Sequence, residues 1–244
     1  MLFQLGGEFM AAFDDFAFSS TDFSGTARLF PLPNLVLFPH VMQPLHIFEP
    51  RYRELLEEAL TTDQLVTMAM LAPGWEKDYE GRPPLFPMAC LGRVAVHHRV
   101  ANGAYNVLVV GLKRVRLLRE LPPSKSFREA KAEVCDDCYP PEEAAATPAL
   151  QRKLRSAFLE ILPHLPQAQD QLDQLLGSEV SLGTLTDIIS YMLDIELVQK
   201  ETLLAEANVH RRTRLLLQHL AAISTDDSPG SGGALVFPPE FSVN

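Results

Sequence analysis

The sequence predicts an α+β protein in which a β-rich part comes first and a helical part follows. Residues 28–135 hold short apolar runs of strand length bounded by Gly, Pro and Asn, whereas after residue 148 apolar residues recur at helical spacing. The segment between them is rich in Pro, Ala and acidic residues, which is typical of a linker. We therefore divide the chain into a disordered extension at 1–27, a β-rich subdomain at 28–135, a linker at 136–148, a helical subdomain at 149–223 and a disordered tail at 224–244.

The composition is that of a globular protein, with 47% hydrophobic and 21% charged residues in a chain of 244. The formal net charge of −10 argues against a protein whose main role is to bind nucleic acid, because phosphate contacts require concentrated Lys and Arg. The chain lacks a run of apolar residues long enough to cross a membrane, a secretory signal pattern and a disulfide framework. We therefore expect a cytoplasmic protein with no membrane partner.

The first elements follow from the positions of proline. Pro31 and Pro33 exclude a helix, and we expect a buried strand at 35–38. Pro50 suits the first turn of a helix, and apolar residues at helical spacing continue from there to Leu60. The sequence therefore predicts an amphipathic helix of about three turns that begins at Pro50.

The remaining strands follow a loop and one hairpin. Residues 65–71 read as a buried strand and 72–87 as a loop. Two strand-like runs, 89–100 and 104–118, meet at Asn102-Gly103, which predicts a hairpin with a type I′ turn. Gly111 interrupts the second run and indicates a bulge or a barrel corner, and a last strand is expected at 129–134.

Five helices are expected after the linker. Apolar stripes and helix-stop residues place the first four within 150–162, 167–176, 185–193 and 198–205. Asn208 is a suitable N-cap for the fifth helix, which extends to about residue 223.

A family resemblance appears in the segment LFPLPNLVLFP at 29–39, followed by PLHIFEPRYRELLEEAL at 44–60. These motifs resemble the start of the substrate-binding domain of Lon proteases, especially its stand-alone bacterial form and the Lon-like part of cereblon. The match continues in order through LGRV at 91–94, VLVVGLKRVRL at 107–117, REAKAEV at 128–134, VQKETLL at 198–204, and Asn208-Val209 with Arg212. The resemblance covers about residues 28–222 and implies a PUA-like β-barrel followed by an α-helical bundle.

The chain departs from full Lon proteases in lacking their ATPase module and their Ser-Lys peptidase. No Gly-Lys dipeptide occurs, so the phosphate-binding loop G-x-x-x-x-G-K-[ST] is absent. Cys135 and Cys138 form a C-x-x-C pair, but a second pair that would complete a zinc site is missing. We therefore expect no catalytic residues, no metal and no cofactor.

The binding candidates lie mainly at the junction between the loop and the first helix. Phe48, Arg51 and Tyr52 combine apolar surface with polar groups, as peptide-binding sites do, although Phe48 and Tyr52 at i and i+4 also suit a purely structural contact. The full set of peptide-binding candidates is Phe38, Phe48, Glu49, Arg51, Tyr52, Arg93, Arg114 and Arg116.

The predicted function is therefore recognition of polypeptides, either unfolded chains or a specific client protein, without catalysis and with a possible link to degradation or quality control. The alternative is RNA or nucleotide binding through the PUA-like barrel, because Arg93, Arg114 and Arg116 belong to two strands rich in basic residues. Strand alternation places Arg114 and Arg116 on one face and Lys113 and Arg119 on the other, which divides the charge, and solvated strand edges are the favoured explanation. A third hypothesis is an enzyme that uses His46 and Glu49.

Overall fold

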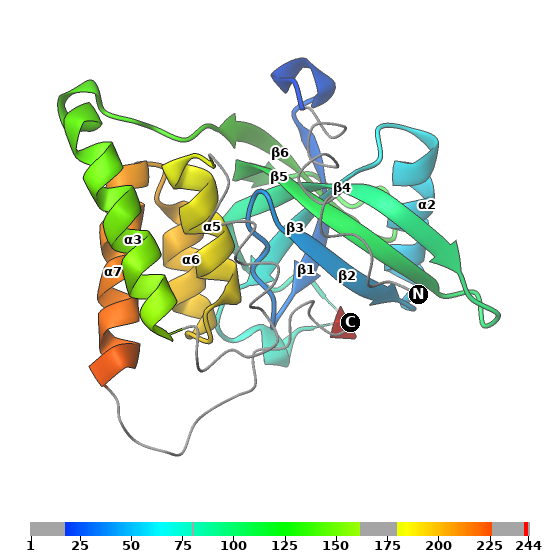
Figure 1. Cartoon of the computed structure of the whole chain (residues 1–244). Coiled ribbons are helices and arrows are strands. Elements are labelled where there is room, and N and C mark those ends of the chain that lie inside the picture. The colour runs from blue at the N-terminus through cyan, green and yellow to red at the C-terminus, as the bar shows by residue number, and fades with distance from the viewer. Residues whose placement is uncertain (1–17, 80, 162–179, 226–241, 244) are drawn as a thin grey trace. The chain divides into compact units, whose positions relative to one another are not determined.

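The computed structural model describes residues 18–79, 81–161, 180–225 and 242–243, which belong to two compact units (Figure 1). One unit is β-rich and comprises residues 18–136 together with the short strand near the C-terminus. The other is helical and begins at Asp137. None of the described helices is long and apolar enough to cross a membrane.

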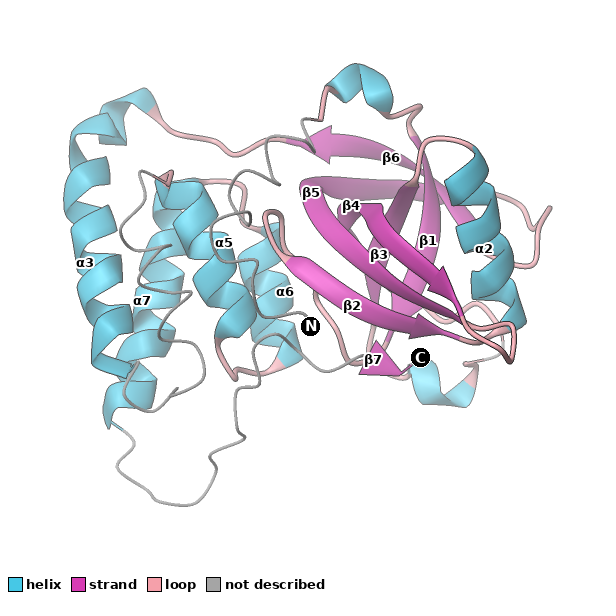
Figure 2. Cartoon of the chain, turned by 45° about the vertical axis from the view of Figure 1, so that its right-hand side comes forward, coloured by secondary structure: helices cyan, strands magenta, loops and turns pink. Residues whose placement is uncertain are grey.

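The β-rich unit is built on one seven-stranded sheet (Figure 2). The strand order is β4-β3-β1-β6-β5-β2-β7, and an additional pairing joins β4 to β5, so that five of the strands form a continuous ring of pairings. Among the described strand pairs of this sheet, β1–β3 and β2–β7 are parallel and the others are antiparallel. The elements are η1 Ser20–Asp22, β1 Thr26–Leu32, β2 Met42–Ile47, α2 Pro50–Thr61, β3 Leu65–Leu71, η2 Trp75–Lys77, β4 Leu85–Arg99, β5 Tyr105–Glu120, β6 Arg128–Cys135 and β7 Ser242–Val243.

The strand expected at 35–38 is wrong, because β1 lies earlier, at Thr26–Leu32, and residues 35–38 form a buried loop. Pro31 is tolerated inside β1 because its backbone groups point away from the β3 ladder. The Pro31 carbonyl accepts a hydrogen bond from the Tyr52 hydroxyl of α2, at 3.2 Å, and so does not face β3. Because the N–H and C=O of one strand residue point to the same side, the Pro31 nitrogen also faces away from β3. The missing amide hydrogen therefore removes no bond to β3.

The predicted hairpin is confirmed, but its turn is not type I′. A type I′ turn requires positive φ at two residues, and in this loop only Gly103 has it, at +81°. The Gly103 amide donates to the Val100 carbonyl at 2.9 Å, and Asn102 uses its side-chain oxygen to accept from the Ala104 amide at 3.1 Å. The loop is therefore longer than two residues and uses glycine at a single left-handed position.

The bulge predicted at Gly111 is also confirmed. Leu91 pairs with Lys113 and Gly92 with Gly111, so Leu112 is the extra residue in β5. A Cβ atom on Gly111 would lie 2.0 Å from the Phe38 carbonyl oxygen, so only glycine allows the 38–41 loop to approach. Gly111 also donates its amide hydrogen to the Val41 carbonyl at 2.8 Å.

The predicted helix at Pro50 is confirmed as α2, with Pro50 in the first turn and Tyr52, Leu55, Leu56 and Ala59 buried. The strand expected at 65–71 is confirmed as β3, in which every residue is buried. A strand buried on both faces reads as a continuous apolar run, which is why the sequence identified it.

The helical unit contains η3 Pro141–Ala146, α3 Thr147–Ile161, α5 Leu182–Met192, α6 Leu197–Ala205 and α7 Val209–Thr225. Four of the five expected helices are confirmed, and the one expected at 167–176 lies outside the described residues. The Asn208 cap is confirmed, since its side-chain oxygen accepts from the Arg211 amide at 3.1 Å. Helix η3 occupies part of the segment that was expected to be a linker.

A buried ion cluster joins the elements of the helical unit. Arg212 of α7 has no exposed side-chain surface and pairs with Asp187 of α5 at 3.1 Å and with Asp137 at 2.9 Å. Its guanidinium also donates to the Glu206 carbonyl at 2.7 Å, just after α6. One side chain therefore links α5, α7, the end of α6 and the segment that precedes η3.

Replacing Arg212 with methionine is expected to reduce the free energy of unfolding by about 3–5 kcal/mol, because it leaves two acidic side chains, one of them fully buried, without their counter-ion. Denaturant unfolding followed by circular dichroism measures the change. The matched control is Arg211→Met on the same helix, where the side chain is exposed and the expected change is within about 0.5 kcal/mol. Equal stability of the two variants would contradict a structural role for the cluster.

The carboxyl group of Glu201 in α6 predicts a pH-dependent stability. Its side chain is 4% exposed, burial raises its pKa from 4.5 to about 8, and its oxygens have no hydrogen-bond partner in the described part of the chain. Between these two pKa values the folded protein holds a proton that the unfolded chain has lost, so the free energy of unfolding falls as pH rises.

Glu201→Gln is therefore expected to stabilise the protein by roughly 2–4 kcal/mol at pH 8 and by little at pH 5. Thermal and denaturant unfolding at both pH values measure the difference. Glu160→Gln, on an exposed site of α3, is the control and should show no such pH dependence. A gain that is the same at both pH values would contradict the buried neutral carboxyl.

Candidate functional site

A pocket of about 220 Å³ opens in the β-rich unit where α2 begins. Its walls come from β1, the first turn of α2, the loop before β4, the loop between β5 and β6, and the start of β6. The lining combines prolines and aromatic rings with four cationic side chains. The residues are Pro31, Arg51, Tyr52, Gly81, Arg82, Pro123, Lys125, Ser126, Phe127 and Arg128.

The start of α2 positions the residues on one side of the pocket. Pro50 fixes the first turn and Glu49 is the N-cap, so Arg51 and Tyr52 leave the helix next to the loop before β4. The Arg51 guanidinium lies 5.1 Å from the centre of the Tyr52 ring and 5.0 Å from that of Tyr79. Glu49 pairs with Arg51 at 2.7 Å and accepts a hydrogen bond from the Tyr79 hydroxyl at 2.9 Å. The guanidinium is therefore held in place by two rings and one carboxylate.

Tyr52 lines the pocket beside Arg51 and is held against strand β1. Its ring stacks on Phe30 with centres 4.3 Å apart, and its hydroxyl donates to the Pro31 carbonyl. Burial raises the pKa of Tyr52 far above its usual value, so the hydroxyl remains a neutral donor. The residue anchors the pocket and presents little surface of its own.

The cations of the pocket are matched by carboxylates. Glu120 accepts from Arg82 at 2.7 Å and from Arg128 at 3.0 Å. Burial opposes ionisation of Glu120, but the hydrogen bonds from the two arginines outweigh it and lower the pKa of this carboxyl below its usual value. Lys125 lies over the Phe127 ring and pairs with Glu58 at 2.6 Å and with Glu129 at 3.1 Å. The lining therefore carries many N–H donors but little net charge.

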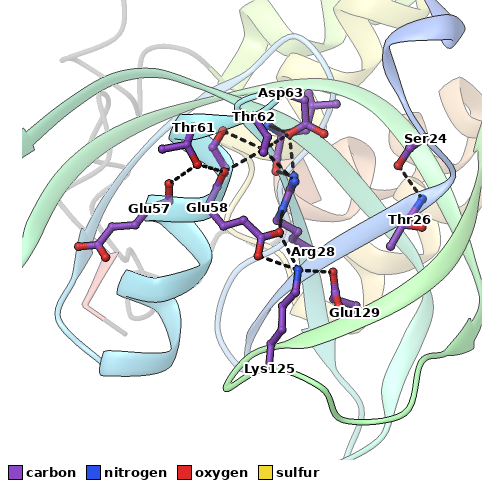
Figure 3. A network of polar contacts seen from close by, with 12 residues as sticks. Ser24, Thr26, Arg28, Glu57, Glu58, Thr61, Thr62, Asp63, Lys125 and Glu129 are labelled. Atoms are coloured by element: carbon purple, nitrogen blue, oxygen red, sulfur yellow. Dashed lines mark hydrogen bonds and ion pairs between the residues drawn. The ribbon is translucent and has the colours of Figure 1, made fainter.

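Lys125 belongs to a network of polar contacts that also includes Glu58, Arg28 and Asp63 (Figure 3). Glu58 of α2 accepts from Lys125 and from Arg28 of β1, the latter at 2.8 Å. Arg28 also donates to Asp63 at 2.7 Å and to Thr62 at 2.9 Å, at the end of α2. Burial opposes ionisation of Glu58, but the hydrogen bonds from Lys125 and Arg28 lower its pKa. The network therefore joins the β5–β6 loop to α2 and β6, and α2 to β1.

The structure brings together three of the sequence candidates, Glu49, Arg51 and Tyr52, at this pocket. Phe48 precedes them with 43% of its surface exposed, and its ring centre is 6.2 Å from that of His46. Phe38 is fully buried in the loop after β1.

The other three candidates lie on β4 and β5, away from the residues that line the pocket. Arg93 is 3.9 Å from Asp22, Arg116 is 3.6 Å from Glu133, and Arg114 is only 2% exposed. Lys113 also pairs with an acidic residue, Asp136, at 2.6 Å. Arg93, Lys113 and Arg116 therefore lie near carboxylates, whereas Arg114 lies in the interior, although strand alternation placed Arg114 and Arg116 on the same face.

Sequence reasoning missed several pocket residues, chiefly the loop residues Arg82, Lys125 and Phe127 and the first residue of β6, Arg128. They lie in or beside two proline-rich segments between strands, at 82–87 and 121–128. These two loops were the feature of the sequence that could have indicated a binding site. Their convergence depends on the sheet topology, because the two segments are about 40 residues apart and meet at Glu120.

His46 and Glu49, the two residues of the enzyme hypothesis, are held by separate partners. His46 is hydrogen-bonded to Asn106 at 2.7 Å, and Glu49 is engaged by Arg51 and Tyr79, so the two proposed catalytic groups have different partners. Among the described residues, no group of three or more His, Cys, Asp or Glu side chains could hold a metal ion. Cys135 and Cys138 are free thiols, and burial raises the pKa of Cys135, which makes it a poorer nucleophile.

Comparisons with known proteins agree on one family. Lon protease 2 of Myxococcus xanthus is 26% identical over 194 residues, which are 79% of this chain but 23% of that protein. Among solved structures, the N-terminal domain of the Mycobacterium avium complex Lon protease is similar with a TM-score of 0.64 at 15% identity, and covers 80% of this chain and 98% of its own. The Lon N-terminal domain protein of Xanthomonas campestris has a TM-score of 0.54 at 21% identity, and covers 79% and 97%.

The chain thus spans about a quarter of the length of the curated relative and nearly all of the two solved domains. These likenesses show an α+β fold of the Lon N-terminal type. The family model described as the ATP-dependent protease La (LON) substrate-binding domain matches residues 26–222. The chain therefore belongs to the Lon substrate-binding domain family.

Proposed function

We propose that this chain is a non-catalytic recognition module that binds polypeptides, either unfolded chains or specific clients, and presents them for degradation or quality control. The ring of strands is, in this proposal, the PUA-like barrel, and the helices that follow it form the bundle. The family match over residues 26–222 supports a role in substrate recognition. The pocket beside α2 is the binding site that we propose for one part of the client.

The size and lining of the pocket support a polypeptide ligand. At about 220 Å³ it is smaller than the roughly 300–1,000 Å³ typical of small-molecule sites, and it suits one or two side chains of a longer chain. Prolines and the Phe127 ring offer apolar contact, while the arginine and lysine groups offer donors to backbone carbonyls. Arg51, held between two tyrosine rings and Glu49, is the observation that carries the proposal, because ordered arginines beside aromatic rings are typical binding hot spots.

The charge balance favours a polypeptide over RNA. Each of the four cations that line the pocket has a carboxylate partner, and the chain as a whole has a formal net charge of −10. A phosphate backbone would have to displace these carboxylates to reach the cations. Peptide binding should therefore depend only weakly on salt, in contrast to the steep dependence of nucleic-acid binding.

Arg51→Met is expected to weaken binding of an unfolded polypeptide about tenfold, because it keeps the aliphatic stem but removes the guanidinium at the pocket. Fluorescence anisotropy with labelled, reduced and carboxymethylated α-lactalbumin measures the affinity, without ATP and at two salt concentrations.

The matched control is Arg53→Met, because Arg53 lies on the same helix but donates to the Gly103 carbonyl and does not line the pocket. Circular dichroism establishes that both variants fold. Equal affinities for the two variants would place the binding site elsewhere, and a steep loss of binding with salt would favour a polyanionic ligand.

A further inference from the structure

The pairing of β2 with β5 determines which residues of β2 direct their backbone N–H and C=O groups toward the opposite, outer edge. Gly111 of β5 donates to the Val41 carbonyl at 2.8 Å, just before β2 begins, and the register continues through six paired residues, Met42 to Ile47. Backbone groups alternate in direction along a strand, so Gln43, Leu45 and Ile47 direct theirs toward β5. Met42, Pro44 and His46 therefore direct theirs toward the opposite edge.

This outer edge is only partly covered in the described part of the chain. Strand β7 pairs with it in parallel through Leu45–Ser242 and His46–Val243, which are two residues of the six in β2. The outward carbonyl of Pro44 accepts a hydrogen bond from the side-chain amide of Gln43 at 2.8 Å. This bond already supplies a donor to the Pro44 carbonyl, so an added strand pairs mainly with the outward groups of Met42 and His46. The chain's own residues 242–243 show the orientation that such a strand takes.

We propose that the outer edge of β2 is a strand-addition site for an extended segment of a client polypeptide, and that Ser242–Val243 are its built-in occupant. This inference rests on the proposed function and adds a binding mode to it. A client enters by displacing β7 and pairing in parallel with β2. A client therefore has to bind the edge of β2 more strongly than the tethered residues 242–243 do.

The chemistry of the edge suits clients of varied sequence. Main-chain hydrogen bonds recognise an extended backbone whatever its side chains are, which is the property that a recogniser of unfolded chains needs. Two paired residues contribute few hydrogen bonds, each of about 0.5–1.5 kcal/mol, so a segment that also pairs at Met42 forms more main-chain hydrogen bonds than β7 does. The tethered segment has the compensating advantage of a roughly millimolar effective concentration.

The test uses a fluorescein-labelled peptide with the sequence of residues 235–244, LVFPPEFSVN, added in trans. A chain that lacks residues 242–244 is expected to bind this peptide at least tenfold more tightly than the full chain, because the tethered competitor is gone. The full-length variant with Ser242→Pro and Val243→Pro is expected to behave like the truncated chain, since proline fits poorly into a paired strand. Neither change alters residues 18–136 of the β-rich unit.

Two further variants of the truncated chain test the edge itself. His46→Pro removes the outward amide hydrogen, whereas His46→Ala removes the imidazole and keeps that hydrogen. The peptide is expected to bind His46→Pro at least tenfold more weakly than His46→Ala. Thermal unfolding shows whether both fold, and if His46→Pro does not fold, the truncated chain and the double-proline variant decide the question.

Equal peptide affinities for the full, truncated and double-proline chains would overturn strand addition. The α-lactalbumin assay separates this failure from that of the proposed function. If truncation leaves α-lactalbumin binding unchanged while Arg51→Met weakens it, the protein is a recognition module that does not use the edge of β2. If α-lactalbumin does not bind to any form, the proposed function is wrong, and binding of the peptide then reports only an intramolecular cover for the edge.

Discussion

The β-rich unit depends on the close approach between Gly111 of β5 and the loop that ends at Val41. A side chain at this position would collide with the Phe38 carbonyl, so the absence of a Cβ atom allows the loop to enter the core and places Phe38 inside. The same contact fixes the register of β2 on β5, and through it the direction of every backbone group along β2. The bulge at Leu112 then lets β5 change partners, from β2 near its start to β6 near its end.

The four cationic side chains of the pocket are neutralised by carboxylates. Four cations would form a strong anion site if they were left alone, but Glu49, Glu58, Glu120 and Glu129 hold them in ion pairs. These pairs contribute order more than stability, since partly exposed ion pairs are each worth about 0–1 kcal/mol. The pocket therefore presents many N–H donors with little net positive charge, unlike the strongly basic faces of nucleic-acid-binding proteins.

The sequence predicted the regular elements better than the site. Strand β3 and helix α2 were found because burial and amphipathic spacing leave direct patterns, and Asn208 was identified as a cap from its residue type alone. The strand at 35–38 was misplaced because its apolar residues are buried in a loop, where burial gives no period. Arg51 and Tyr52 became candidates because they adjoin a helix start, whereas naming Lys125 and Arg128 as pocket residues required knowing which segments meet. Residue patterns along a sequence do not show which distant segments the sheet topology brings together.

The ring of pairings also constrains how the protein folds. Strand β1 at the start of the β-rich unit pairs with β6 at its end, and a hydrogen bond joins Thr26 to Lys131 across a sequence separation of 105 residues. Contacts of such high separation carry a large loop-closure entropy and slow the folding of a domain. During synthesis, β1 has only β3 as a neighbour until β6 leaves the ribosome, so one edge of β1 stays exposed for most of the translation of this unit. The open edge of β1 is therefore the place where an incompletely synthesised chain is most exposed to non-native strand pairing.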